Sequence, residues 1–208
     1  MTRLLRGLVL VPLLILAGCG NPAEDKPEAK VGDATHGDSP LAKGTEYTFV
    51  EQSKIEFIGS KVTGQHDGGF TSFDGKFHLV DNDPTRSSAQ INIDTTSLWS
   101  DNDRLTGHLK SPDFFDVATH PQATFQTTSI VKDGDAYEVT GNLQLHGVTK
   151  SITFPAAIAV GNDQVVVNSE FFIKRFDFGI EYKGKADDLI RDEVVIKLSM
   201  IGKAGSPS

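Results

Sequence analysis

The sequence is poor in cysteine, with one in 208 residues, and it lacks the short motifs that mark common catalytic sites. One cysteine cannot form a disulfide within the chain or supply a cysteine-based zinc centre. There is no Gly-x-Ser-x-Gly turn, no glycine-rich phosphate loop and no His-Glu-x-x-His pair. These absences exclude the hydrolases, nucleotide-binding enzymes and zinc proteases that such motifs define. We therefore expect a protein without catalytic residues, metal or cofactor.

Positive charge is also scarce, because 20 Lys and Arg stand against 28 Asp and Glu, giving a net charge of −8. No cluster of basic residues with interleaved aromatic residues occurs. An acidic chain repels phosphate backbones, so this balance excludes nucleic acid as an expected partner.

Long hydrophobic runs are absent as well. The apolar run from Leu8 to Leu16 follows Arg3 and Arg6 and is shorter than the roughly 20 residues of a transmembrane helix. This pattern predicts a secretion signal over residues 1–18. Leu16-Ala17-Gly18-Cys19 resembles a bacterial lipobox, which predicts acylation of Cys19 and anchoring to a membrane. The alternative is an ordinary cleaved signal peptide with a stray cysteine nearby.

The expected location follows from this signal. An acylated Cys19 places the protein in the cell envelope, on the periplasmic side, and Gly20 rather than Asp after the cysteine favours the outer membrane of a Gram-negative cell. Residues 20–44 are rich in small, charged and Pro residues, with only Val31 and Leu41 as sizeable aliphatic side chains. We therefore expect residues 19–44 to form an acylated, disordered tether, followed by one domain over residues 45–203 and a tail over residues 204–208.

Alternation of apolar and polar residues dominates residues 45–203 and is typical of half-buried strands. Short connections such as Asp133-Gly134-Asp135 and His146-Gly147 separate successive strands. The pattern predicts an all-β fold, an antiparallel up-and-down barrel of about eight strands, with an open two-sheet sandwich as the structural alternative. Clear examples of the alternation lie at residues 54–57, 75–79, 90–94, 123–132, 136–145, 150–160, 165–174 and 196–200.

One helix interrupts this pattern. It is expected to begin near Asp101 or Asp103, where an acidic residue can cap the free backbone N–H groups, and to end before Pro112. Two interpretations stay open: the helix is a plug whose leucines are ordinary core, or it belongs to a lid over a ligand cavity. The lid would be formed by Leu105, Leu109, Phe114 and Phe115.

Polar residues give no metal or catalytic cluster in the sequence, because the histidines are spread over separate elements. His108 and His120 can be structural imidazoles or contacts to the headgroup of a lipid. Arg104 and Arg175 can pair with neighbouring carboxylates or contact a headgroup in the same way. The stretch from Lys174 to Gly179 is expected to bend at the barrel rim, with Phe176 and Phe178 as a hydrophobic gate.

Several segments in the same order resemble the YceI-like, polyisoprenoid-binding family of bacterial envelope proteins. Together they extend over nearly all of the domain, from Tyr47 to Ile201. The resemblance implies an eight-stranded, lipocalin-like barrel whose apolar pore holds a long isoprenoid or similar lipid, without established catalysis. The segments are residues 57–61, 69–70, 73–75, 102–125, 141–150 and 174–180.

The residues expected to line the pore are mostly aromatic, in a sequence that has 13 Phe but three Tyr and one Trp. Buried Phe adds apolar surface with no polar atom to satisfy, which suits a core and a lipid pocket alike. The expected lining is Phe57, Phe73, Phe77, Ile91, Ile93, Leu105, Leu109, Phe114, Phe115, Phe125, Leu143, Phe154, Phe171, Ile173, Phe176, Phe178 and Leu198.

The sequence thus favours binding, sequestration or presentation of a long-chain apolar lipid, an isoprenoid or an isoprenoid quinone. The alternative is a structural or stress-response module with a solid barrel that acts through protein partners. Chemistry on the isoprenoid or quinone is a distant third interpretation. A homodimer is left open.

Overall fold

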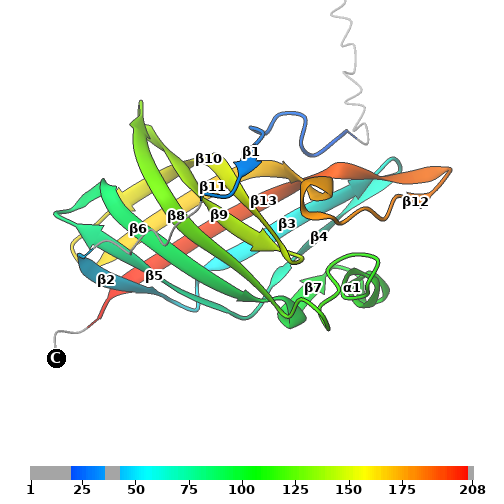
Figure 1. Cartoon of the computed structure of the whole chain (residues 1–208), viewed down its shortest axis with the longest axis horizontal. Coiled ribbons are helices and arrows are strands. Elements are labelled where there is room, and N and C mark those ends of the chain that lie inside the picture. Colours follow the sequence, from blue (N-terminus) through cyan, green and yellow to red (C-terminus); the bar gives the residue numbers. More distant parts are fainter. Residues whose placement is uncertain (1–19, 36–42, 206–208) are drawn as a thin grey trace, which may run out of the picture.

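The computed structural model describes residues 20–35 and 43–205, and most of these residues lie in antiparallel strands (Figure 1). The elements, in chain order, are β1 (Lys30–Asp33), β2 (Thr45–Phe49), β3 (Lys54–Lys61), β4 (Gly64–Phe70), β5 (Phe73–Val80), β6 (Asp83–Asp94), η1 (Thr95–Ser97), β7 (Leu98–Ser100), α1 (Asp103–Leu109), β8 (Gln122–Asp133), β9 (Ala136–Leu145), β10 (Val148–Val160), β11 (Gln164–Lys174), η2 (Arg175–Phe178), β12 (Gly184–Lys185) and β13 (Asp188–Ala204).

These elements build a closed barrel of eight long wall strands, as expected from the sequence. Five wall strands are continuous: β8, β9, β10, β11 and β13. The other three are interrupted. β2 and β3 lie end to end along β13, β4 and β5 lie end to end beside them, and β6 continues through η1 into β7. β13 pairs with β11 on one edge and with β2 and β3 on the other, which closes the wall.

The three interruptions lie beside one another, at residues 50–53, 71–72 and 95–97. Hydrogen bonds cross them, because the Thr71 N–H donates to the Ser97 carbonyl at 3.4 Å and the Asp94 N–H donates to the Ser72 carbonyl at 3.0 Å. The wall therefore bends at this level without losing its backbone pairing.

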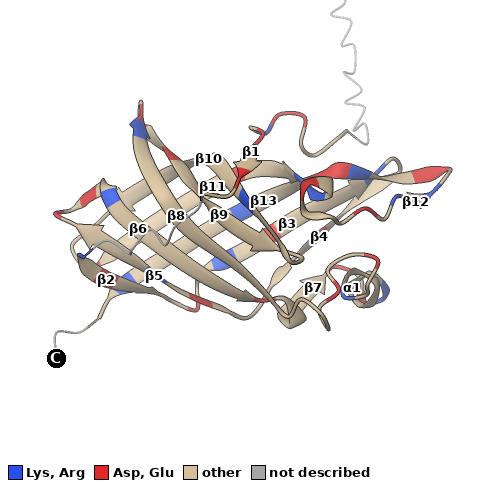
Figure 2. Ribbon diagram, in the orientation of Figure 1, with Lys and Arg blue, Asp and Glu red and all other residues tan. Residues whose placement is uncertain are grey.

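The strands alternate between the interior and the surface of the barrel. In β5, Gly75, Phe77 and Leu79 are buried, whereas Asp74 and Lys76 are exposed. Two expected turns are confirmed, since Asp133-Gly134-Asp135 joins β8 to β9 and His146-Gly147 joins β9 to β10. Charged residues of both signs alternate along the β12–β13 end of the molecule (Figure 2).

The expected helix is α1, and it forms part of the lid segment, residues 101–121, between β7 and β8. Its cap differs from the expected acidic residue: Asn102 accepts a hydrogen bond from the Leu105 N–H at 3.0 Å. Asp103 lies instead in the first helical turn, where its negative charge interacts favourably with the positive end of the helix dipole. Among the described residues, no helix is both long and apolar enough to cross a membrane.

The disordered tether expected for residues 19–44 is wrong for residues 20–35, which pack on the barrel. β1 pairs with β10 over four residues, and Ala23 and Ala29 are buried. The composition was misleading because a single added strand needs few large side chains when an existing sheet supplies its hydrogen bonds. Cys19 and the remaining tether residues at 36–42 lie outside the described residues. At the other end, β13 extends to Ala204, one residue into the expected tail.

Candidate functional site

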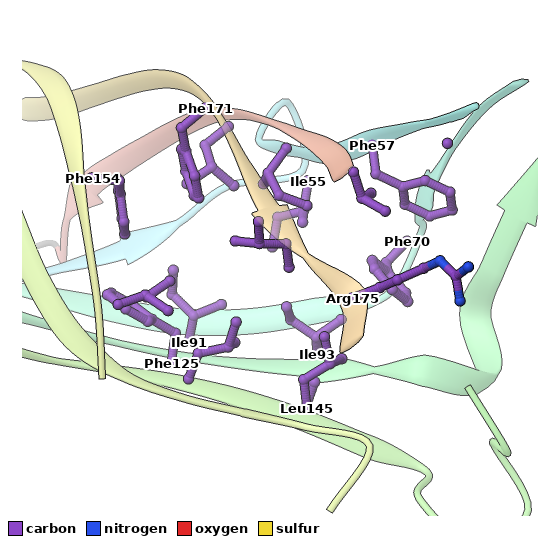
Figure 3. A pocket seen from close by; sticks show the side chains of 18 of the residues that line it. Ile55, Phe57, Phe70, Ile91, Ile93, Phe125, Leu145, Phe154, Phe171 and Arg175 are labelled. Carbon is purple, nitrogen blue, oxygen red and sulfur yellow. The ribbon is translucent and has the colours of Figure 1, made fainter. Parts of the chain in front are cut away.

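An apolar cavity of about 400 Å³ lies inside the barrel (Figure 3). A closed eight-stranded barrel has an interior wide enough to be filled by side chains or to hold a small ligand, and here space remains. The volume falls within the range of ligand pockets. Side chains from every wall strand and from the lid segment contribute, and most are aliphatic or aromatic.

The middle of the cavity is bounded by three phenylalanines, from β8, β10 and β11. Phe154 and Phe171 stack with their ring centroids 4.3 Å apart and their planes at 10°. Phe125 meets Phe154 at 5.7 Å between centroids. Such ring pairs prefer these offset and tilted geometries, which fix the shape of the wall.

The lid segment covers one end of the cavity, where it contributes to a second group of aromatic side chains. Phe115 lies 6.2 Å from Phe57 and 5.8 Å from Phe70 between ring centroids. Leu109 and Phe114 are buried in the same cluster. The interpretation of residues 105–115 as part of a cavity lid therefore agrees with their position, because all four predicted lid residues line the cavity.

Two glycines make room for the aromatic rings. A Cβ at Gly141 would lie 2.4 Å from Cζ of Phe125, and a Cβ at Gly68 would lie 2.4 Å from Cζ of Phe57. In each case the ring packs directly over the backbone of the neighbouring strand. The absence of a side chain at these positions thus sets where the rings stand.

Most of the residues predicted to line the pore do so. The structure brings together Phe57, Phe77, Ile91, Ile93, Leu105, Leu109, Phe114, Phe115, Phe125, Leu143, Phe154, Phe171, Ile173 and Leu198. For the ten that lie on strands, the signal was alternation with polar neighbours, which is sufficient to assign an inward face, whereas Leu105, Leu109, Phe114 and Phe115 were predicted as part of the lid.

Three predicted lining residues lie elsewhere. Phe73 is half-buried at the start of β5 and packs in a neighbouring core cluster. Phe176 is 38% exposed and covers the guanidinium of Arg175, whose Cζ is 4.6 Å from the ring centroid. Phe178 is fully buried in η2 and packs in the main core. The expected hydrophobic gate fails because residues 175–178 form a 3₁₀ turn rather than a strand, which removes the alternation.

Sequence reasoning missed other parts of the wall that the same alternation could have found. Ile55 stands two residues before Phe57, Leu145 two after Leu143, and Ile196 and Met200 flank Leu198 on the same strand face; all four line the cavity. Phe70 also contributes a ring, at the end of a strand whose glycines and polar residues hide its pattern.

Arg175 is the one predicted headgroup contact that reaches the cavity, and it is 4% exposed. Its guanidinium donates three hydrogen bonds: Nε to the Arg191 carbonyl at 3.0 Å, Nη1 to the Ile180 carbonyl at 2.6 Å, and Nη2 to the Ile190 carbonyl at 3.3 Å. Burial lowers the pKa of Arg175 below its ordinary value, and the negative charge of Asp192 opposes that shift. Arg175 therefore clamps η2 to β13 at the cavity rim.

The other predicted headgroup contacts lie outside the cavity lining. Arg104 is exposed on α1. His108 bonds to Asp113 through Nε2 at 2.8 Å and packs against the rings of Phe114 and Tyr182. His120 packs against His146, with ring centroids 4.8 Å apart. These contacts fit the structural alternative for both histidines.

A few polar side chains gather at the lid end of the cavity. Lys61 is paired with Asp188, and His66 Nδ1 lies 2.8 Å from Asp101 Oδ1. Arg191 also lines this end, and its Nε is buried with no hydrogen-bond partner in the part of the chain that the structure describes. No group of three or more His, Cys, Asp or Glu side chains within residues 20–35 and 43–205 is placed to hold a metal ion.

Comparison with known proteins matches residues 47–201 to the family described as the YceI-like domain. Protein YceI of Escherichia coli O6:H1 is 35% identical over 156 residues, which cover 72% of this chain and 80% of that protein. The crystal structure of BcnA from Burkholderia cenocepacia has a TM-score of 0.66 at 27% identity and covers 72% of this chain and 96% of that one.

A second solved structure supports the same fold. The polyisoprenoid binding domain from Saccharophagus degradans, implicated in plant cell wall breakdown, superimposes with a TM-score of 0.63 at 20% identity, covering 80% of this chain and all of that domain. The matched region contains all eight wall strands and the lid segment, apart from the first residues of β2 and the last residues of β13. On this agreement of sequence and fold, the chain belongs to the YceI-like family.

Proposed function

We propose that the barrel binds one long-chain apolar lipid, an isoprenoid or an isoprenoid quinone, and holds it without chemical conversion. The observation that carries the proposal is the cavity, which is enclosed by aliphatic and aromatic side chains from all eight wall strands. Transfer of a prenyl chain from water to such a wall contributes about 0.8 kcal/mol for each buried CH₂ group. Hydrophobic burial therefore supplies most of the binding free energy.

The solved relative from Saccharophagus degradans supports the choice of ligand, because it is described as a polyisoprenoid binding domain. In this chain, the aromatic groups around Phe154 and Phe115 give flat surfaces against which an unsaturated chain packs well. A module with a solid barrel, the alternative from the sequence, would not leave this cavity.

The lipid's polar end belongs at the lid end of the cavity. The polar lining residues Lys61, His66, Arg175 and Arg191 gather there, whereas the middle is apolar. Arg191 offers a buried N–H that no other described residue accepts, and a carbonyl or hydroxyl oxygen of a headgroup would satisfy it. An isoprenoid tail would then extend past Phe125 toward Phe77.

The same proposal includes a membrane anchor. The lipobox-like sequence before Cys19 supports acylation of that cysteine, secretion to the periplasmic side of the envelope and retention at the outer membrane. Because the segment from residue 20 packs on the barrel, an anchor at Cys19 would hold the cavity close to the membrane surface rather than at the end of a long tether.

A cavity-filling variant tests the function. Gly59 lines the cavity, and a Cβ built there meets no atom within 4 Å, so Gly59→Phe adds a ring to the cavity with little strain. Gly64 also has open space around its Cβ position but lies outside the lining. Gly64→Phe is therefore the matched control.

Lipids are extracted from natively purified protein and measured by mass spectrometry. We expect wild type and Gly64→Phe to carry a long-chain lipid in comparable amounts and Gly59→Phe to carry at least tenfold less. Equal lipid in all three proteins would place the ligand outside the cavity, and no lipid in wild type would remove the support for the proposal.

A further inference from the structure

The barrel wall is split between β10 and β11 over part of its height. The two strands pair directly only through four residues on each, from Ala157↔Asn168 to Val160↔Val165. The ladder stops at Ala157, and two residues earlier in β10 Pro155 has no N–H to donate. Its carbonyl accepts a hydrogen bond from the Ser169 side chain instead of from the backbone of β11. From this proline toward Val148, the backbones of β10 and β11 no longer pair directly, although the rings of Phe154 and Phe171 still stack between the two strands.

The N-terminal segment occupies the split. We name residues 27–33 the strap. On one side, the strap pairs with β10 from Lys30↔Thr153 to Asp33↔Lys150. On the other side, the Ala29 N–H donates to the Phe172 carbonyl at 2.9 Å, and the Phe172 N–H donates to the Pro27 carbonyl at 3.0 Å. The strap is thus an inserted strand that completes the wall.

The strap stands directly against residues that line the cavity. Val31 pairs with Ile152 and therefore shares its inward face, and Ala29 and Val31 pack in the main core cluster. On the two sides of the split, Ile152 and Phe154 of β10 and Phe171 and Ile173 of β11 line the cavity. Without the strap, the stacked rings of Phe154 and Phe171 would stand between the split and the apolar interior, so the route to the cavity opens when the strap leaves and these two rings part.

The attachment of the strap is light compared with that of the wall strands. Its inward side chains are small, and beside its backbone hydrogen bonds it is held by three ion pairs at the surface: Lys30 with Glu138 at 3.0 Å, Glu28 with Lys174 at 2.7 Å and Asp33 with Lys150 at 3.6 Å. Exposed ion pairs contribute little to stability and are weakened by salt. Beyond Ala29 the strap leaves β11, and a polar groove of about 600 Å³ separates it from Lys174 and Asp177. The strap also lies outside the matched family domain, residues 47–201.

We infer that the strap is a displaceable part of the barrel wall and that the split beneath it is a lateral portal through which the apolar chain of the ligand enters and leaves. The inference rests on the proposed function, because it assigns a route to the proposed ligand. A lateral route suits a long chain, which would then enter the cavity along its length instead of threading past the lid segment.

A reversible lock on the strap tests this portal. Lys30 and Thr153 face each other in register on the outer side, so Lys30→Cys with Thr153→Cys, in a Cys19→Ser background, ties the strap to β10. Glu56→Cys with Lys197→Cys ties β3 to β13 in the same way and serves as the control. The probe is the fluorescent apolar dye N-phenyl-1-naphthylamine, followed by stopped flow.

We expect the oxidised strap lock to slow both association and dissociation of the dye at least tenfold, with little change in equilibrium affinity, and reduction to restore both rates. The control lock should leave the rates within twofold of wild type. Equal rates in the locked and reduced strap variant would overturn the portal.

A second variant covers failure of the lock to form. Glu28→Lys with Lys30→Glu reverses two of the three ion pairs of the strap, those with Lys174 and Glu138, and we expect dye dissociation to become at least threefold faster while the melting temperature stays nearly constant. Unchanged dissociation contradicts the portal.

If wild type binds no dye, the proposed function fails, but the opening of the strap can still be measured by hydrogen exchange. Protection of residues 29–33 equal to that of β9 would show that the strap does not open.

Discussion

At the scale of single residues, the cavity depends on positions where a side chain is missing as much as on the rings that line it. The ring of Phe125 packs over Gly141 on the adjacent strand, and the ring of Phe57 packs over Gly68 in the same manner. A glycine weakens a strand in general, but here it lets a ring lie flat against the backbone. The position of the ring then shapes the cavity.

Gly141→Ala should therefore destabilise the fold and disturb the cavity. The new Cβ would lie 2.4 Å from Phe125 Cζ and 2.5 Å from the Gln126 carbonyl oxygen, so the ring and the backbone must both move. We expect a loss of about 1–3 kcal/mol in the free energy of unfolding, measured in urea. Gly161→Ala, whose Cβ would have its nearest neighbours at 3.5 Å, should change it by less than about 0.5 kcal/mol. Equal effects would contradict this role of Gly141.

Arg175 shows how a buried charge serves structure at the cavity rim. Its three hydrogen bonds go to carbonyls in two separate stretches of chain, and a lysine ammonium cannot reach all three from one point. Arg175→Lys should lower the free energy of unfolding by about 2–4 kcal/mol. The exposed Arg104→Lys on α1 is the control and should change it by less than about 0.5 kcal/mol. A small effect at Arg175 would show that the clamp is dispensable.

At the scale of elements, the β3–β4 hairpin is tied to the start of β13 by one carboxylate. Asp188 pairs with Lys61 and accepts hydrogen bonds from the Thr63 N–H at 3.3 Å and the Thr63 hydroxyl at 2.9 Å. The bond from Lys61, aided by Thr63, lowers the pKa of Asp188 below its ordinary value, although partial burial opposes the shift. This carboxylate thus favours the folded state only when it is ionised.

The stability that Asp188 contributes depends on pH. Because the pKa of Asp188 is lower in the folded state, this contribution is complete above the unfolded pKa of about 3.9 and is lost as the pH falls through the folded pKa. Asp188→Asn should lower the melting temperature at pH 6, and its difference from wild type should shrink toward pH 2. Asp135→Asn, in the β8–β9 turn, is the control. A difference that stays constant from pH 6 to pH 2 would argue against the ionised carboxylate as the cause.

The continuous wall strands could be predicted from the sequence because alternation reports which face of a strand is buried, and β8 to β11 follow it over ten or more residues. That signal also places Phe77, Phe125 and Phe171 in the cavity. It fails where the backbone leaves the strand, as at Phe176 and Phe178, because a 3₁₀ turn points successive side chains in other directions. It also misses β1, whose stability comes from edges that other strands offer and not from its own composition.

At the scale of the whole molecule, a ligand that fills the cavity binds only the closed barrel, because the lining residues come from all eight wall strands. Binding must then stabilise the fold by mass action. At a free lipid concentration of 100 times the dissociation constant, the gain is about 2.7 kcal/mol, which corresponds to a rise of about 5–10 °C in melting temperature for a domain of this size.

Differential scanning fluorimetry with the C20 isoprenoid alcohol geranylgeraniol in mild detergent measures this rise. The Gly59→Phe variant should show less than half of it because the added ring occupies the same space, and Gly64→Phe should show all of it. An equal rise in both variants would indicate binding to the outer surface of the barrel.

The position of β13 has a consequence for folding. Through residues 193–203 this strand pairs with all of β11, and it also pairs with β2 and β3, which lie more than a hundred residues earlier in the chain. A chain made from its N-terminus therefore cannot close the barrel until its final strand is available, and closure requires contacts of large sequence separation, which favours slow folding. Before β13 pairs, the inward faces of the other wall strands cannot enclose a complete interior. The cavity therefore forms only when the residues of β13 have been made and have paired with both edges of the wall.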